Sequence, residues 1–478
     1  MTTDAPTAAP IEATAKGLPV PPGPAPLAAA SPPTPKMWRL YLGFLLPMIA
    51  SNFLQAASGT VNNIYIGQMI GVSAMAAVSS FFPLLFFLMA FMIGLGTGAA
   101  VLIGQAWGAR EPERVKAVAG TTLAVGLCFG AAVALLGGIF TEAILKALGT
   151  PADILPSSIA YARVMLLAAP WLFVYLLVTS MLRGVGDTRT PLKILLIANG
   201  IGLLLTPALI RGWGGLPQLG VASAAYAASL SFTVAMAWTA WHLRRKRSPL
   251  APDAQLRRHL RIDGAILGKV LRIGLPSALT IITMALSELA VLFLVNRFGS
   301  QATAAYGAVN QIISYVQFPA ISIAITASIL GAQAIGAGRI ESLGKIAQTG
   351  ISLNLLLTGS LVLLGYLFSR DIIGLFITDA AVVETAQTLL HIMLWSLVIF
   401  GMSTVLSGLM RASGYVVWPT AITFSCIAFV QVPAAWLLSG HFGLNGVWMA
   451  YPLAFTAMLV LQTAYYRLVW KHQRITRL

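Results

Sequence analysis

One acidic side chain lies where it could carry an ion through an apolar environment. The 478-residue sequence contains 14 Asp and Glu residues, and all except Glu288 fall in the amino-terminal tail, in polar loops or at the ends of apolar runs. Glu288 precedes the end of the run 265–296 by eight residues, roughly 12 Å along a helix. A buried carboxylate is costly while charged, so it readily takes up a proton or a cation. We interpret Glu288 as an ion-coupling residue for H⁺ or Na⁺; the alternative is a structural acid that hydrogen-bonds a neighbouring helix or pairs with Arg297.

A second candidate for coupling is His391. It lies about ten residues into the run 382–410, and Trp395 follows one helical turn later. Imidazole can titrate near neutral pH, which suits a coupling role. The alternative is a histidine that packs and hydrogen-bonds within the helix bundle, and both interpretations stay open.

Polar side chains repeat on one face of the first apolar run. Asn52, Gln55, Gly59 and Asn62 are three or four residues apart, the spacing of one helix face. Such a stripe can line a cavity or join helices, and for any single residue both remain possible. A shift of 228 residues along the sequence carries the first three to polar residues of the seventh run. The predicted substrate-cavity residues are Asn52, Gln55, Asn62, Asn63, Thr280, Thr283, Ser287, Tyr306, Asn310, Gln317 and Trp395.

A proline precedes each of these polar stripes, Pro47 in the first run and Pro276 in the seventh. Proline leaves a backbone carbonyl without its helical partner and allows a helix to bend. We predict a gating role for both, with packing as the alternative.

Composition places the chain in a membrane. Hydrophobic residues make up 58% of the sequence and charged residues 9%, compared with about 25% charged residues in soluble domains. The runs can cross a hydrocarbon core of about 30 Å as helices and lack the alternation of membrane β-strands. We therefore predict an all-α integral membrane protein with twelve transmembrane helices, near 40–66, 74–104, 116–139, 157–182, 191–210, 219–243, 265–296, 302–335, 342–368, 382–410, 418–438 and 444–470.

Basic residues are unevenly distributed between alternate loops. With the amino terminus inside, 25 Lys and Arg residues fall on the inner side and five on the outer side. Cytoplasmic loops are enriched in these residues, so we expect both termini in the cytoplasm, and we assign the net charge of +16 to topology, not to nucleic-acid binding. The expected parts are a disordered cytoplasmic tail (1–36), a six-helix bundle (37–243), a basic linker (244–263), a second six-helix bundle (264–471) and a cytoplasmic tail (472–478).

The two halves resemble each other in sequence. The 228-residue shift aligns separated clusters, which are Gln105-Ala106 with Gln333-Ala334, Gly71 with Gly299, and Arg183 and Gly186 with Arg411 and Gly414. Six spans return the chain to its starting side, so the copies are parallel and related by a pseudo-two-fold axis along the membrane normal. Two such bundles leave a cavity between them, which suits alternating access.

Three motifs resemble those of multidrug and toxic compound extrusion (MATE) transporters, most closely the bacterial branch related to DNA-damage-inducible exporters. They are Gly94–Gly98 (GLGTG), Gly104-Gln105 and Leu182–Thr188 (LRGVGDT). The resemblance covers about residues 37–470. It implies export of bulky, often cationic organic compounds from a bacterial inner membrane, driven by inward flow of H⁺ or Na⁺.

The chain departs from that family pattern at its acidic positions. Many bacterial relatives carry an aspartate in the first span, where this sequence has Asn62 and Asn63. Others carry an acid in the tenth span, at a position that corresponds to Phe400. Because an amide cannot take up a proton, Glu288 is left as the expected ion carrier.

Two other functions are alternatives to efflux. A flippase for a lipid-linked or polysaccharide precursor would need a cavity ringed by Arg and Lys. A membrane-embedded lipid-processing enzyme would need clustered His, Asp or Glu. The sequence has no HExxH motif and no phosphate-binding loop. We therefore expect a monomeric, non-enzymatic transporter with no cofactor, no bound metal except possible Na⁺ at Glu288, and membrane lipid and small organic cations as partners.

Overall fold

Helices form almost the whole of the chain in the computed structural model, which describes residues 37–377 and 379–478. The predicted tail, residues 1–36, lies outside this described part. The first half contains α1 (Met37–Met69), α2 (Val72–Gly108), α3 (Pro112–Ala147), α4 (Leu155–Leu167), α5 (Ala169–Gly184), α6 (Arg189–Arg211), the 3₁₀ turn η1 (Trp213–Gly215) and α7 (Ala222–Arg245). The second half follows the short helix α8 (Ala254–Arg258) and contains α9 (Gly264–Asn296), α10 (Ser300–Gly336), α11 (Ser342–Leu367), α12 (Ser369–Gly374), α13 (Ala380–Ala412), α14 (Val417–Ser425), the π-helical turn η2 (Cys426–Gln431), α15 (Val432–Phe442), α16 (Leu444–Leu468) and η3 (Trp470–His472).

The twelve predicted spans correspond to these helices. Ten segments of the described chain are long and apolar enough to cross a membrane, and the bent pair α4–α5 makes an eleventh. The twelfth is α7, which is 24 residues long and rich in Ala and Ser, so it is less apolar than the rest. The prediction of an all-α membrane protein with two six-helix halves is confirmed.

Local sequence explains where two spans depart from a straight helix. The fourth span, expected as one helix, bends by 51° between α4 and α5. Pro170 lies in the first turn of α5 and cannot donate the backbone hydrogen bond that would continue α4. The matching span α13 has Val398 at the equivalent position and is continuous. In the eleventh span, the π-helical turn η2 ends two residues before Pro433, which cannot donate a backbone hydrogen bond to the preceding turn.

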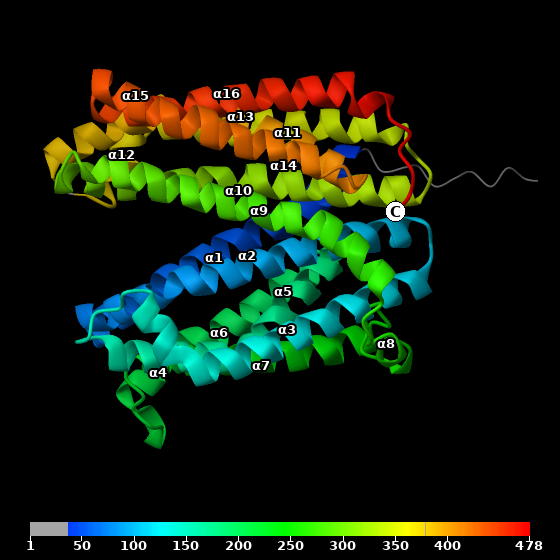
Figure 1. Cartoon of the computed structure of the whole chain (residues 1–478), viewed down its shortest axis with the longest axis horizontal. Coiled ribbons are helices and arrows are strands. Elements are labelled where there is room, and N and C mark those ends of the chain that lie inside the picture. The colour runs from blue at the N-terminus through cyan, green and yellow to red at the C-terminus, as the bar shows by residue number, and fades with distance from the viewer. Residues whose placement is uncertain (1–36, 378) are drawn as a thin grey trace, which may run out of the picture. The chain divides into compact units, whose positions relative to one another are not determined.

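The two halves use the same packing plan. In each half the second helix packs on the fourth span, as α2 does on α5 and α10 does on α13. The third helix covers the same span from another side, as α3 covers α5 and α11 covers α13. Figure 1 shows the second half, from α9 to α16, above the first half.

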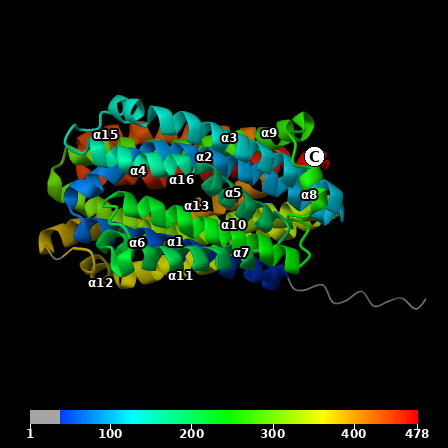
Figure 2. The same ribbon diagram turned by 90° about the horizontal axis from the view of Figure 1, so that it is seen from below.

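Contacts between the halves concentrate at one end of the helices, which we call the linker end because α8 lies there (Figure 1). One apolar core cluster joins Tyr41 of α1, Val101 of α2, Ile273 of α9 and Ala327 of α10. The hydroxyl of Tyr41 also donates a hydrogen bond to the carbonyl of Ile346 in α11, at 2.9 Å. Figure 2 shows α1 beside α6 of its own half and α11 of the other half, and both pairs are in contact.

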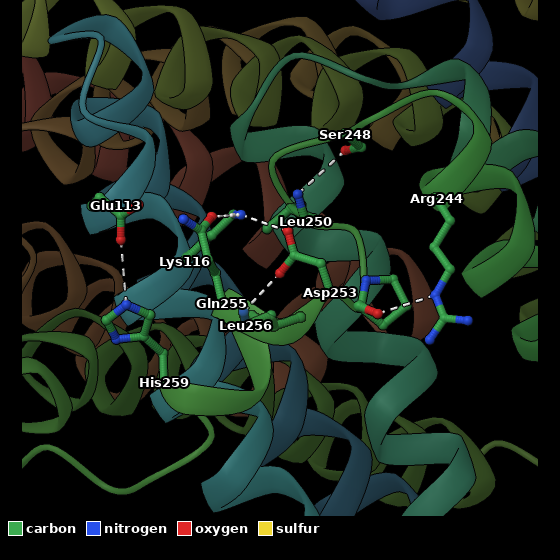
Figure 3. A network of polar contacts seen from close by, with 10 residues as sticks. Glu113, Lys116, Arg244, Ser248, Leu250, Asp253, Gln255, Leu256 and His259 are labelled. Atoms are coloured by element: carbon green, nitrogen blue, oxygen red, sulfur yellow. Dashed lines mark hydrogen bonds and ion pairs between the residues drawn. The ribbon is translucent and has the colours of Figure 1, made fainter.

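The linker between the halves is held on α3 by a polar network (Figure 3). The ammonium of Lys116 donates a hydrogen bond to Asp253 at 2.6 Å and another to Gln255. Asp253 in turn accepts from the backbone N–H of Leu256 at 2.8 Å and so caps α8. Lys116 holds the pKa of the Asp253 carboxyl below its usual range, chiefly by hydrogen bonding. The linker is therefore attached to the first half by a charged pair at the start of α3.

We expect Asp253→Ala to release α8 from α3. The change removes a helix cap and an ion pair, so protection of the Leu256 amide from hydrogen exchange should fall about tenfold at neutral pH. Because the pKa of Asp253 is lowered by folding, this protection is present above its unfolded value, near 4, and is lost as the pH falls through the folded value. The control is Glu113→Gln, which affects a neighbouring 3.5 Å pair with His259. Equal protection in Asp253→Ala and the unaltered protein would contradict this assignment.

Candidate functional site

A cleft of about 730 Å³ separates the halves at the end opposite the linker. It is walled by the last turns of α1, the first turns of α10 and the segment after α12. Its polar side chains are amides and hydroxyls, and none of its lining residues is charged: Thr60, Asn63, Ile64, Gly67, Gln68, Met75, Ala304, Gly307, Ala308, Gln311, Tyr315, Phe376 and Ile377. Such a lining can accept an amphiphilic molecule without pairing it with a fixed charge.

Three aromatic side chains join the two halves near this cleft. Phe53 of α1 stacks on Tyr315 of α10, with ring centroids 5.5 Å apart, and meets Phe318 edge-on at the same distance. Tyr315 itself lines the cleft, and Phe53 is 41% exposed. This group was not predicted from the sequence, although Phe53 lies between two predicted residues, Asn52 and Gln55. Aromatic faces attract organic cations, so the group adds a binding surface to a neutral cleft.

A smaller polar cavity of about 170 Å³ lies within the first half, between α1, α6 and α7. Asn62 lines it together with Ser58 and Asn199. The hydroxyl of Ser58 donates to the side-chain oxygen of Asn199 at 3.0 Å, and the Asn199 amide nitrogen is buried without a partner among the described residues. Asn199, a lone amide in the apolar run of α6, was not predicted from the sequence. Because no carboxylate lines this cavity, it cannot take up a proton.

The α1 stripe therefore faces different neighbours along its length. Asn52 donates to the hydroxyl of Ser322 in α10 at 3.0 Å and so joins the halves. Gln55 is exposed, Asn62 faces the first-half cavity and Asn63 faces the cleft. The structure thus places each of these four predicted residues in a different environment.

Glu288 lies on an exposed position of α9. Its carboxylate is within electrostatic range of the hydroxyls of Tyr306 and Tyr451, on α10 and α16. Arg297, the alternative partner, lies over the ring of Phe293 at 5.6 Å and makes no ion pair with Glu288 within the described residues. Glu288 therefore lies on the surface of α9, outside the lining of the cleft, and has no fixed cation beside it among the described residues.

The other predicted residues of α9 and α10 lie mostly in helix contacts. Thr280 donates to the carbonyl of Pro276 and to Thr420 of α14, and Thr283 donates within its own helix. Ser287 is buried, with no hydrogen-bond partner in the described part. Tyr306 packs in the apolar core of the second half, 5.4 Å from the ring of Trp448. Asn310 and Gln317 are half-buried on α10.

His391 and Trp395 lie on α13, near α11 and α12. The His391 ring nitrogen Nε2 is 3.0 Å from the hydroxyl of Ser369, which also accepts from Gln387. Tyr366 donates to the His391 carbonyl at 2.7 Å. Trp395 is 46% exposed and is not among the residues that line the cleft. These contacts join α13 to α11 and α12. Among the described residues, neither His391 nor Trp395 forms a hydrogen bond or an ion pair with Glu288.

The two predicted gating prolines lie inside continuous helices that contact the opposite half. Pro47 lies in α1 and Pro276 in α9, and the hydroxyl of Ser51 donates to the Pro47 carbonyl at 2.7 Å. Near Pro276, α9 touches α2 so closely that a Cβ on Gly94 would overlap the Gly274 carbonyl. Gly94 and Gly98 of the GLGTG motif therefore form a close helix contact with α9, and a gating role for the prolines stays a prediction.

At the linker end the halves are closed by two reciprocal hydrogen bonds. The Gln105 amide donates to the carbonyl of Ala412 at 2.8 Å, and the Gln333 amide donates to the carbonyl of Gly184 at 2.9 Å. The 228-residue shift converts one bond into the other, so both obey the pseudo-two-fold relation. We call these two hydrogen bonds the glutamine clasp.

Glycines allow the backbones to meet beside the clasp. A Cβ on Gly108 would overlap the carbonyl of Gln333, and a Cβ on Gly336 would overlap that of Gln105. The segment after α16 adds a further connection, because Arg477 donates to Glu111 at 2.6 Å. The cleft therefore opens at one end of the helices while the other end is closed, which is one of the two states that alternating access requires.

Comparison with known proteins identifies the family of this two-half arrangement. A profile described as MatE matches residues 47–208 and 276–437, one match in each half. The chain belongs to the MatE family. It is 44% identical over 455 residues to "Probable multidrug resistance protein YoeA" of Bacillus subtilis, covering 95% of this chain and 98% of that protein.

More distant MatE proteins agree with this assignment. "Multidrug export protein MepA" of Staphylococcus aureus is 25% identical over 418 residues, which cover 86% of this chain and 89% of that protein. The fold matches the crystal structure of a mutant of the Vibrio cholerae MATE transporter VcmN, with a TM-score of 0.84, 21% identity and coverage of 91% of this chain and 98% of that one. The predicted family resemblance is therefore confirmed.

Proposed function

We propose that this protein is a secondary active efflux transporter that exports amphiphilic, cationic organic compounds by antiport with H⁺ or Na⁺. Two features together carry the proposal. The cleft between the two related halves has no charged lining residue, and the glutamine clasp closes the opposite, linker end of the helices. The names of the relatives YoeA and MepA support a multidrug substrate range. In the proposed cycle the halves rock, so that the cleft faces each side of the membrane in turn.

The proposed orientation puts the linker end and the described carboxyl-terminal segment in the cytoplasm of a bacterium, with the helices in its inner membrane. The excess of Lys and Arg in the loops at that end supports it. The structure then corresponds to an outward-facing state, in which Glu288 takes up an ion from outside and the cleft releases its substrate.

The lining of the cleft favours efflux of cations over the alternative functions. A flippase for a phosphorylated precursor would need Arg or Lys around the substrate, and the residues that line the cleft include neither. A lipid-processing enzyme would need a cluster of acids or histidines, and the described residues hold no group of three that could bind a metal. The aromatic group of Phe53, Tyr315 and Phe318 suits a flat organic cation.

Transport into inside-out vesicles under separately imposed ΔpH and Na⁺ gradients tests the proposal. We expect one gradient, acting alone, to drive accumulation of a lipophilic cation such as ethidium. The same gradient should have no effect in vesicles without the protein. Accumulation that needs ATP, or none under either gradient, would refute ion-coupled efflux of such cations.

We expect Phe53→Ala to weaken substrate binding without uncoupling transport. Loss of one aromatic face should raise the KM for ethidium roughly tenfold, while the ratio of ions to substrate stays unchanged. The control is Trp436→Ala, since Trp436 is 62% exposed on α15 and is not a lining residue of the cleft. An unchanged KM in Phe53→Ala would show that the aromatic group lies outside the binding surface.

A further inference from the structure

Each half carries a groove at the linker end, on the side of its third helix. The first-half groove is about 370 Å³ and lies between α3, α5 and α7; the second-half groove is about 900 Å³ and lies between α11, α13 and α16. The 228-residue shift relates four of their lining pairs, Ala119 with Ala347, Leu123 with Ile351, Val174 with Met402, and Val178 with Leu406. The grooves are therefore copies of one feature.

The two copies differ in what covers their outer ends. Leu250, Pro252 and Leu256 of the linker line the end of the first-half groove. Two cations bind the linker segment that forms this cover: Arg244 donates to the Pro252 carbonyl at 3.0 Å, and Lys116 is paired with Asp253. In the first half, the linker thus covers the outer end of the groove, and the basic side chains there are bonded to the linker.

In the second half, three exposed basic side chains line the corresponding end, namely Arg467, Lys471 and His472. None of them forms an ion pair with the described residues, whereas Arg477, a few residues further on, is paired with Glu111. No acidic residue lines this groove. A concentrated positive charge without a protein partner, at the edge of an apolar groove, is complementary to an anion with an apolar tail.

The depth of the second-half groove matches one leaflet of the bilayer. Its wall reaches Met402, which precedes the end of α13 by ten residues, or roughly 15 Å along the helix. Half of a hydrocarbon core is also roughly 15 Å. An acyl chain lying along Ile351, Leu406 and Leu459 therefore puts its phosphate at the level of Arg467 and Lys471.

We propose that the second-half groove binds an anionic phospholipid of the leaflet at the linker end. The acyl chain occupies the apolar wall, and the phosphate accepts hydrogen bonds from Arg467 and Lys471. Basic clusters at the ends of membrane helices attract anionic lipids by this electrostatic mechanism. The lipid fills in the second half the position that the linker fills in the first.

Lipid retention in detergent, measured by native mass spectrometry, tests the proposal without depending on transport. The purified protein is titrated with dioleoyl phosphatidylglycerol and with dioleoyl phosphatidylcholine. We expect the phosphatidylglycerol to bind more tightly, and Arg467→Gln with Lys471→Gln to weaken its binding roughly thirtyfold. The matched control is Arg257→Gln with Arg258→Gln, which removes two exposed cations of α8 outside the groove.

A second variant distinguishes lipid binding in the groove from simple attraction to the exposed basic side chains. Ser352→Phe fills the exposed wall of the groove while keeping every cation, and we expect it to lower phosphatidylglycerol binding as well. Equal binding in the double variant and the control would overturn the proposal, as would displacement of the lipid by glycerol phosphate at the same concentration. Because the readout is binding, loss of efflux activity alone would leave the outcome unaffected.

Discussion

Glu288→Gln is expected to abolish ion-driven efflux while substrate still binds. Glutamine keeps the size of the side chain but can neither take up a proton nor hold Na⁺ by charge. Glu288 is the only acid of the described residues that we place away from the ends of the spans, and it has no fixed cation beside it in the described structure. Gradient-driven accumulation of ethidium in vesicles should therefore fall to the level of protein-free vesicles.

The measurement needs a binding assay beside the transport assay. Ethidium fluorescence should report a dissociation constant within about threefold of that of the unaltered protein, because the cleft lining is untouched. The control is Glu384→Gln, an exposed acid in the first turns of α13. If transport by Glu288→Gln remained fully coupled to the ion gradient, the ion site would lie elsewhere. His391 would then be the next residue to alter.

Gly336→Ala is expected to open the linker end and to reduce transport strongly. The added methyl group would overlap the backbone carbonyl of Gln105, and backbone cannot turn aside as a side chain can. Separating the helices there also breaks the glutamine clasp, since Gln333 lies one turn before Gly336. Alanine favours a helix by about 1 kcal/mol over glycine, so lower activity would not come from a weaker α10.

Distances between spin labels on opposite halves measure this opening. Labels at Glu113 and Glu341, in a background without Cys128 and Cys426, should show a longer distance in Gly336→Ala. Gly108→Ala should act in the same way, because the pseudo-symmetric clash involves Gln333. Gly268→Ala is the control, since a Cβ there meets no atom within 4 Å. Identical distance distributions in Gly336→Ala and Gly268→Ala would show that the contact does not control closure.

The fold was predictable because its signals either are local in the sequence or recur at one fixed offset. Apolar runs of sufficient length define spans, and one shift of 228 residues relates the halves. The bend after Ala168 had a visible cause in Pro170, but only comparison with the unbroken α13 shows its effect.

The site was less predictable because it depends on contacts between the halves. Helical periodicity puts Asn52 and Asn62 on one face of α1, yet it cannot show that one meets α10 and the other α6. The aromatic group of Phe53, Tyr315 and Phe318 and the pairing of Gln105 with Ala412 combine residues more than 250 positions apart. No pattern within one helix indicates such a contact.

The glutamine clasp also bears on the energy available for each cycle. Two amide hydrogen bonds contribute about 2 kcal/mol net, and rocking replaces apolar contacts at one end of the helices with contacts at the other. One proton moving down a gradient of one pH unit releases about 1.4 kcal/mol, and one charge crossing 100 mV releases about 2.3 kcal/mol. In the proposed antiport cycle, one ion per turnover would release enough free energy to break both hydrogen bonds of the glutamine clasp, so the clasp would not hold the linker end permanently closed.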